Sequence, residues 1–168
     1  MRKKVVRKQT ASHGCFICGR DNPASTKADF YEMEDSTLVT LVTCRKEHMG
    51  FPSILHGGVT ASILDEAMGR SYQILNPGYL GMTIEMNIKY FKPVPYDVEL
   101  KVVTRAMEAS ERTYRAEGKL YLPNGKLAAS GEGVYLKADQ AKKEELSFGK
   151  EDVLDVTSPD DPEYIDIP

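Results

Sequence analysis

The sequence of 168 residues has no apolar run approaching the roughly 18 residues needed to cross a bilayer, so we expect no membrane-spanning helix. No apolar segment follows the basic residues near the start, so a secretory signal is not expected either. There are only three cysteines, which cannot all pair, and this fits a reducing compartment. These absences predict a cytoplasmic protein that has no membrane partner.

Short motifs of several enzyme classes are also absent. The sequence has no Gly-x-Ser-x-Gly, no phosphate-binding loop and no dinucleotide fingerprint, and no cysteine and histidine stand in a recognisable catalytic context. No internal repeat is visible. The patterns of serine hydrolases, P-loop enzymes and dinucleotide-binding enzymes are therefore excluded, and no cofactor is expected.

The composition is that of one soluble domain, with 41% hydrophobic and 28% charged residues. The first ten residues are rich in Lys and Arg, whereas acids outnumber bases after Asp139 and prolines gather near the end. We expect both ends to be solvated extensions: a basic tail and loop over 1–26, a folded domain over 27–138 and an acidic tail over 139–168. A basic decamer could touch nucleic acid, but the body has no basic patch, so no nucleic-acid partner is expected.

The cysteines raise the alternative of a zinc site. Cys15-x-x-Cys18 and Cys44-x-x-x-His48 have the ligand types and spacings of a Cys3His set. Zinc ribbons usually pair two tight knuckles, whereas Cys44 ends a strand-like apolar run in which a buried thiol needs no function. We therefore predict no structural metal at Cys15 and Cys18.

The apolar pattern predicts one helix and six strands. The helix is expected from Gly57 to about Leu75, apolar on nearly every side and stopped by Asn76-Pro77-Gly78, so it belongs in a core. Asn124-Gly125 favours a hairpin. The expected strands cover 27–34, 37–44, 82–92, 97–106, 112–122 and 126–137. Short connections between the last four strands predict an α+β fold of order β-β-α-β-β-β-β, one antiparallel sheet around one long helix.

The start of this helix is the first candidate for chemistry. His56 is followed by Gly57 and Gly58, so backbone N–H groups lie bare of side chains where the helix dipole strengthens them. A carbonyl oxygen could approach such donors. The alternative is a glycine loop that only lets the helix pack closely against the sheet.

The second candidate is Asp65, an acid in an apolar helix. Its neighbour Glu66 has Arg70 four residues later as an ion-pair partner, but Asp65 has no local basic partner. Burial of such a carboxylate is costly, so it needs either a tertiary hydrogen bond or a catalytic role.

Four segments together resemble the phenylacetate-pathway (PaaI-type) thioesterases and the mitochondrial acyl-CoA thioesterases. They are Cys15-Phe16-Ile17-Cys18-Gly19 with Asp21-Asn22-Pro23, Gly50-Phe51-Pro52 leading to His56-Gly57-Gly58, Asp65-Glu66-Ala67-Met68-Gly69, and Met82-Thr83 through Lys92-Pro93-Val94-Pro95. The resemblance covers most of residues 15–137. It implies a hotdog fold, in which an antiparallel sheet wraps a central helix, and an acyl-CoA thioesterase that works as a homodimer or a dimer of dimers.

The resemblance also implies roles for particular residues. Gly57 and Gly58 would present the N–H group that polarises the thioester carbonyl, and His56 would brace that loop. Asp65 would activate water or attack the carbonyl, and Thr83 would orient water or substrate. The sequence departs from some relatives at Gly50, where they have an asparagine that helps hold the carbonyl, and at Ser53, where a glycine is frequent. Catalysis could therefore be weaker or differently tuned.

The chemistry of thioesters agrees with this set of candidate residues. A thioester has a good leaving group and little resonance stabilisation, so a carbonyl-polarising donor and a positioned carboxylate could suffice without a serine nucleophile or a metal. A hotdog hydratase or dehydratase and a non-catalytic acyl-CoA binder remain alternatives. The acyl chain cannot be read from the sequence, and the residues that grip CoA are candidates by charge only: Arg70, Lys89, Lys92, Arg112 and Arg115.

Helix geometry adds two expectations. Gly58 and Asp65 share one helix face but stand roughly 10 Å apart along the axis, too far for both to touch one carbonyl group. We therefore expect two chains to share each active site. On the strand that follows, alternation places Thr83 on the face opposite Met82, Ile84 and Met86.

Overall fold

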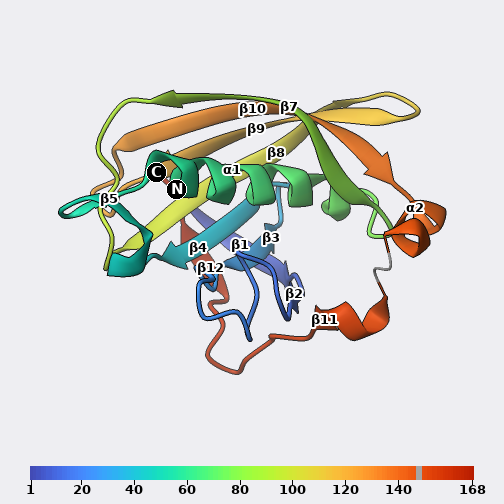
Figure 1. The fold of residues 1–168 in the computed structure, drawn as a ribbon, viewed down its shortest axis with the longest axis horizontal. Coiled ribbons are helices and arrows are strands. Elements are labelled where there is room, and N and C mark those ends of the chain that lie inside the picture. The colour runs from blue at the N-terminus through green and yellow to red at the C-terminus, as the bar shows by residue number, and fades with distance from the viewer. Residues whose placement is uncertain (147–148) are drawn as a thin grey trace.

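The computed structural model describes residues 1–146 and 149–168. An antiparallel sheet of eight strands curls around the helix α1, Gly57–Ser71, as Figure 1 shows. The strands lie in the order β12-β1-β3-β4-β8-β9-β10-β7. Their bounds are β1 Arg2–Lys8, β3 Asp29–Met33, β4 Leu38–Thr43, β7 Leu80–Tyr90, β8 Glu99–Ala109, β9 Thr113–Tyr121, β10 Leu127–Ala138 and β12 Tyr164–Asp166. The predicted α+β class, one antiparallel sheet wrapped around one long helix, is confirmed.

Shorter elements complete the chain. Two small two-stranded antiparallel sheets pair β5 with β6 and β2 with β11, and the helix α2 follows β10. Their bounds are β2 Ala11–Ser12, β5 Met49–Phe51, β6 Ile54–Leu55, β11 Val153–Leu154 and α2 Gln140–Glu145, with 3-10 turns at Lys46–His48, Tyr72–Ile74 and Lys150–Asp152. Each of the six predicted strands is present, and the predicted end of the helix near Leu75 coincides with the end of the 3-10 turn that continues α1.

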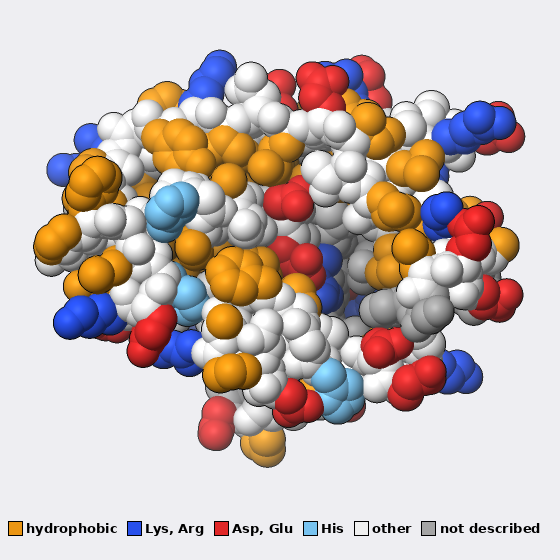
Figure 2. All heavy atoms as spheres, viewed as in Figure 1, with side chains coloured by type: hydrophobic (Ala, Val, Ile, Leu, Met, Phe, Trp, Pro, Cys, Tyr) orange, Lys and Arg blue, Asp and Glu red, His pale blue; other side chains and the backbone are white. Residues whose placement is uncertain are grey.

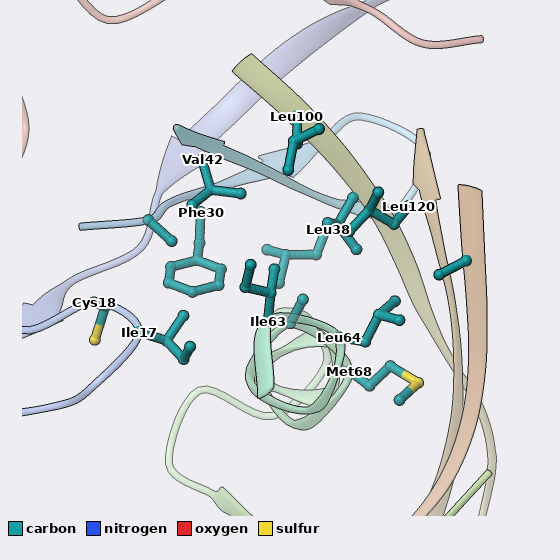
Figure 3. Close-up of a cluster of buried hydrophobic side chains, with 14 of the residues drawn as sticks. Ile17, Cys18, Phe30, Leu38, Val42, Ile63, Leu64, Met68, Leu100 and Leu120 are labelled. Atoms are coloured by element: carbon teal, nitrogen blue, oxygen red, sulfur yellow. The ribbon is translucent and has the colours of Figure 1, made fainter. Parts of the chain in front are cut away.

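One face of α1 forms the core. Ile63, Leu64 and Met68 are fully buried and face Leu38, Leu100 and Leu120 of the sheet, as Figure 3 shows. Burial of each such side chain contributes about 1.5–3 kcal/mol. The opposite face of α1, which carries Asp65 and Glu66, is only half-buried. The helix is therefore not enclosed on every side, and the part left open is the part that bears the carboxylates.

Both ends of the chain differ from the expected solvated extensions. β1 pairs with β3, and β12 pairs with β1, so the ends add two strands to the sheet. The basic side chains of β1 have acidic partners: Arg7 lies 2.6 Å from Glu32 and Lys8 lies 2.7 Å from Asp161. Ile165 is buried in a second apolar cluster with Tyr31, Met33 and Val39. Charge pairing and this apolar contact explain why the terminal segments are ordered.

The C-terminal segment over 139–168 makes further contacts with the rest of the chain. β11 pairs with β2, and Lys143 donates a 2.6 Å hydrogen bond to the carbonyl oxygen of Gly78. Residues 147–148 of this segment lie outside the described residues. No described helix combines the length and the apolar character needed to span a membrane.

A β-bulge in β7 changes which side chains face the helix. Glu85 pairs with Val134, but Thr83 pairs with Tyr135, so Ile84 has no partner and is 59% exposed. Because a bulge shifts the alternation by one residue, Thr83 faces α1 although Met86 also packs against the core. The prediction that Thr83 and Met86 lie on opposite faces was therefore wrong, because simple alternation contains no information about a bulge.

Candidate active site

His56 caps the N-terminus of α1. Its Nδ1 atom accepts a 2.9 Å hydrogen bond from the Gly58 amide, and its carbonyl oxygen accepts from the amides of Val59 and Thr60 at 3.0 and 3.2 Å. A Cβ atom on residue 58 would stand 3.0 Å from the His56 Nδ1 atom, which explains the small residue there. His56 thus has the geometry of a loop brace, the role that the resemblance implied.

Gly57 is left as the available donor at this helix start. Its amide is the first of the helix, where no intrahelical acceptor exists, and among residues 1–146 and 149–168 it has no acceptor. The residue is exposed, and its carbonyl oxygen accepts a 2.7 Å hydrogen bond from the Tyr90 hydroxyl. Of the two predicted donors, therefore, Gly58 is occupied by His56, and Gly57 can still polarise a carbonyl oxygen.

Asp65 lies two turns further along α1 and has two tertiary partners. Its Oδ1 atom accepts hydrogen bonds from the Thr83 hydroxyl at 2.8 Å and from the Tyr135 hydroxyl at 3.1 Å. Burial and the nearby Asp65 carboxylate raise the pKa of Tyr135, so this phenol stays protonated and acts as a donor. Both bonds go to the same carboxylate oxygen, and Oδ2 points to no donor in the described part of the chain.

The Thr83 hydroxyl supplies a test of this arrangement. Thr83→Val keeps the volume but removes the donor, so Asp65 would keep only Tyr135 as a partner. We expect turnover to fall by about tenfold, equal to about 1.4 kcal/mol, the scale of one hydrogen bond to a charged group. Steady-state kinetics check the fall, and thermal unfolding checks that the variant is folded. Unchanged turnover would count against any role of Thr83 in positioning Asp65.

Glu66 and Arg70 form the predicted ion pair, with 2.7 Å between the Arg70 Nε and Glu66 Oε1 atoms. Arg70 also donates to the carbonyl oxygen of Thr10 at 2.9 Å and lies 4.3 Å from the ring centroid of Phe30. Its side chain is only 14% exposed. These contacts occupy much of the guanidinium group, so Arg70 is less suited to gripping a nucleotide than its charge alone suggested.

A pocket of about 440 Å³ opens beside the exposed face of α1. Its lining includes Asp65, Thr83 and Tyr135, together with the basic residues Arg70 and Lys143. Figure 2 shows this face hollowed near its centre, with acidic and basic side chains inside the hollow. The pocket does not include His56, Gly57 or Gly58. One chain therefore presents the carboxylate and the helix-start donor at separate places.

The other candidate binding residues lie outside this pocket. Gly50 is in β5, where a Cβ atom would stand 3.0 Å from the Cα atom of His56, so a small residue fits there. Ser53, at the tip of the β5–β6 hairpin, has a φ of +66°, which explains why a glycine would suit this position. Lys89 in β7 and Lys92 just after it are both exposed.

The alternative Cys3His set is not assembled. The His48 Nδ1 atom accepts a bond from the Arg45 amide at 3.0 Å, and Nε2 lies 2.9 Å from the Ala24 carbonyl oxygen. Both ring nitrogens of His48 are thus used by the backbone. Among the described residues, the group of potential metal ligands that comes together is Cys15, Cys18 and Glu66, whose ligand atoms lie within 4.8 Å of one another.

Comparison with known proteins shows which proteins this chain is similar to. Residues 53–129 match the family model of the thioesterase superfamily. A crystal structure of a thioesterase superfamily protein superposes with a TM-score of 0.67 at 25% identity, covering 74% of this chain and 60% of that one. A Bacillus halodurans protein crystallised with CoA gives a TM-score of 0.54 at 29% identity, covering 59% of this chain and 66% of that one. The chain therefore has the hotdog fold, and its residues 53–129 are similar to the thioesterase superfamily.

A further relative is similar in sequence but has no described function. An uncharacterized protein of Schizosaccharomyces pombe is 26% identical over 99 residues, which cover 56% of this chain and 57% of that protein. The matched part thus spans less than two thirds of the length of both this relative and the first crystal structure above.

Two contacts at the site were not predicted from the sequence. Tyr135 reaches Asp65 from β10, and Tyr90 reaches the Gly57 carbonyl oxygen from β7. Alternation along each strand was visible, but the partner of a tyrosine depends on the register between strands and on the bulge at Ile84. No signal in a single sequence gives that register.

Proposed function

We propose that the protein is an acyl-CoA thioesterase of the PaaI type, which hydrolyses a thioester to a free acid and CoA. One observation carries the proposal: Asp65 is held on one oxygen by Thr83 and Tyr135, on a helix whose first amide, that of Gly57, has no acceptor in the part of the chain that the structure describes. The Bacillus halodurans relative crystallised with CoA supports CoA as the thiol part of the substrate.

The proposed reaction needs only these groups and a water. The Gly57 amide donates to the thioester oxygen and stabilises the negative charge that develops on it. The free Oδ2 atom of Asp65 takes a proton from water while the water oxygen attacks the carbonyl carbon. Collapse of the tetrahedral intermediate breaks the C–S bond, and the CoA thiolate leaves. The geometry also supports an alternative mechanism, in which Asp65 attacks the carbonyl carbon directly and forms a mixed anhydride with the acyl group.

A second copy of the chain would complete the site. β7 is an 11-residue strand at the edge of the sheet, and one side of its backbone has no partner strand among the described residues. Ile84, Tyr90 and Phe91 are each more than half exposed along or just after it. A long apolar edge of this kind is a template for pairing with another strand. We propose that two chains pair along β7 across a two-fold axis, with dimers of dimers as a further assembly.

Such pairing brings the separated groups together. Gly57 contacts Tyr90 at the end of β7, whereas Asp65 contacts Thr83 near its beginning. Antiparallel pairing centred between Met86 and Asn87 would place Tyr90 of one chain opposite Thr83 of the other. The free amide of each helix start would then approach the carboxylate of the partner's helix, which gives two equivalent sites per dimer.

The domain division and the compartment are part of the same proposal. We assign residues 27–138 as the hotdog domain, with 1–26 and 139–168 adding strands to its edge. The three cysteines are free in the structure, which supports the cytoplasm as the compartment.

A panel of acyl-CoAs of different chain length and polarity tests the activity. CoA release is followed with a thiol reagent and the acid product by chromatography. We expect the two products in a one-to-one ratio, with the rate highest for one class of acyl group. A hydratase would change the acyl chain without releasing CoA, and a non-catalytic binder would release neither product. Either result across the whole panel would contradict the proposal.

A further inference from the structure

Cys15 and Cys18 lie on one tight turn. The Gly19 amide donates a 2.8 Å hydrogen bond to the Cys15 carbonyl oxygen, which closes a turn of helical type. A Cβ atom on residue 19 would stand 2.3 Å from that oxygen, so only glycine closes the turn in this form. Residues three apart on such a turn point to the same side, and the two sulfur atoms lie within 4.8 Å of each other. A disulfide needs its sulfur atoms about 2 Å apart, so the side chains would have to rotate toward each other before the bond forms.

A guanidinium group lies against the pair. The Arg70 Nη2 atom is 3.1 Å from the Cys18 sulfur. A hydrogen bond from Cys15 and the charge of Arg70 lower the pKa of Cys18, even though burial and Glu66 act in the opposite direction. The pKa of Cys15 is raised because its thiol donates that bond and is partly buried. Of the two thiols, Cys18 is therefore the one whose surroundings favour the thiolate.

The two sulfurs differ in access, and Cys44 provides a contrast. Both cysteines line the pocket beside α1, but Cys15 is half-buried whereas Cys18 has no exposed surface. Cys44 is also fully buried, and burial raises its pKa to about 12. A small reagent in the pocket would therefore meet Cys15 first, with Cys18 behind it and Cys44 out of reach.

A metal ion fits this cluster less well than redox chemistry does. The Arg70 guanidinium already stands where a cation would stand, 2.7 Å from Glu66 and 3.1 Å from the Cys18 sulfur. The Thr10 carbonyl oxygen and the Phe30 ring hold it there. A divalent ion would have to displace this group before it could bind both sulfurs and Glu66.

We propose that Cys15 and Cys18 form a redox-active dithiol that reacts reversibly with low-molecular-weight disulfides entering the pocket. Cys15 loses its proton to solvent and attacks one sulfur of the small disulfide, whose S–S bond breaks and releases one thiolate. The Cys18 thiolate beside Arg70 then attacks the Cys15 sulfur, which releases the second thiolate. Two protein thiols and one small disulfide thus become one protein disulfide and two small thiols.

Oxidised glutathione is the probe for the first test. The full-length protein is incubated with it at pH 7, quenched by alkylation under denaturing conditions and measured by mass spectrometry. We expect the wild type to lose two alkylatable thiols without gaining glutathione, and reduced glutathione to reverse the change. Cys18→Ser should hold one glutathione on Cys15, whereas Cys15→Ser should react far more slowly because Cys18 is buried.

The Glu66–Arg70 ion pair beside the cysteines provides a control that separates an effect on the Cys18 thiolate from a general loss of stability. Arg70→Gln and Glu66→Gln both break the same ion pair, but they act oppositely on the Cys18 thiolate. We expect disulfide formation to slow by about tenfold in Arg70→Gln and to quicken in Glu66→Gln, since one pKa unit changes the thiolate fraction about tenfold. Equal shifts in both variants would overturn the proposal. So would a wild type that forms no Cys15–Cys18 disulfide, or purified protein that holds one zinc released by thiol alkylation.

Discussion

Asp65→Asn is expected to lower kcat by about 10²–10⁴-fold, the range that a positioned general base contributes. The amide has nearly the same shape as the carboxylate, and its oxygen can still accept the bonds from Thr83 and Tyr135. The fold and substrate binding should therefore persist while proton transfer from water is lost. Thiol release from the best acyl-CoA of the panel measures the fall, and KM should change much less than kcat.

Glu66→Gln is the matched control for this loss. Glu66 is the next residue on α1 and also carries a carboxylate, but it pairs with Arg70 rather than with Thr83 and Tyr135. We expect its kcat to stay within about tenfold of the wild type, the effect of about 1.4 kcal/mol. If Asp65→Asn retained wild-type kcat, or if Glu66→Gln lost as much activity, Asp65 would not be the base.

Local patterns were enough to predict the interior of this fold. The apolar run of α1 and the stop at Asn76-Pro77-Gly78 gave the helix, and Asn124-Gly125 gave the β9–β10 turn, where Gly125 has a φ of +76°. The ends could not be predicted in the same way. β1 and β12 pair across nearly the whole chain, and the acids that neutralise Arg7 and Lys8 come from distant segments.

In the candidate site, too, contacts between residues close in sequence could be predicted, whereas contacts between distant residues could not. The Glu66–Arg70 pair is a contact between residues four apart on one helix, so the spacing predicts it. The Arg70–Cys18 contact joins residues 52 positions apart, and the Tyr135–Asp65 contact joins residues 70 positions apart. Such contacts depend on the bulge in β7 and on the packing of the N-terminal turn against α1. Neither of these follows from periodicity.

Gly57→Pro is designed to remove only the proposed carbonyl donor. Proline has no N–H, and it is favoured at the first position of a helix, the place that Gly57 holds. His56 before it has φ −60° and ψ 135°, a conformation that a following proline permits. A Cβ atom on residue 57 would meet Tyr90 at ordinary contact distances of 3.7 Å or more. We expect a folded protein whose kcat is lower by about 10²–10³-fold.

Subunit mixing of Asp65→Asn with Gly57→Pro tests most directly whether each site is built from two chains. The two nearly inactive variants are combined, exchanged by mild denaturation and refolded, with exchange confirmed by mass spectrometry of the intact dimers. Random exchange makes half of the dimers mixed, and each mixed dimer regains one of its two sites. Roughly a quarter of wild-type activity should therefore return. No return of activity, with both parents refolded and exchange confirmed, would contradict the shared site.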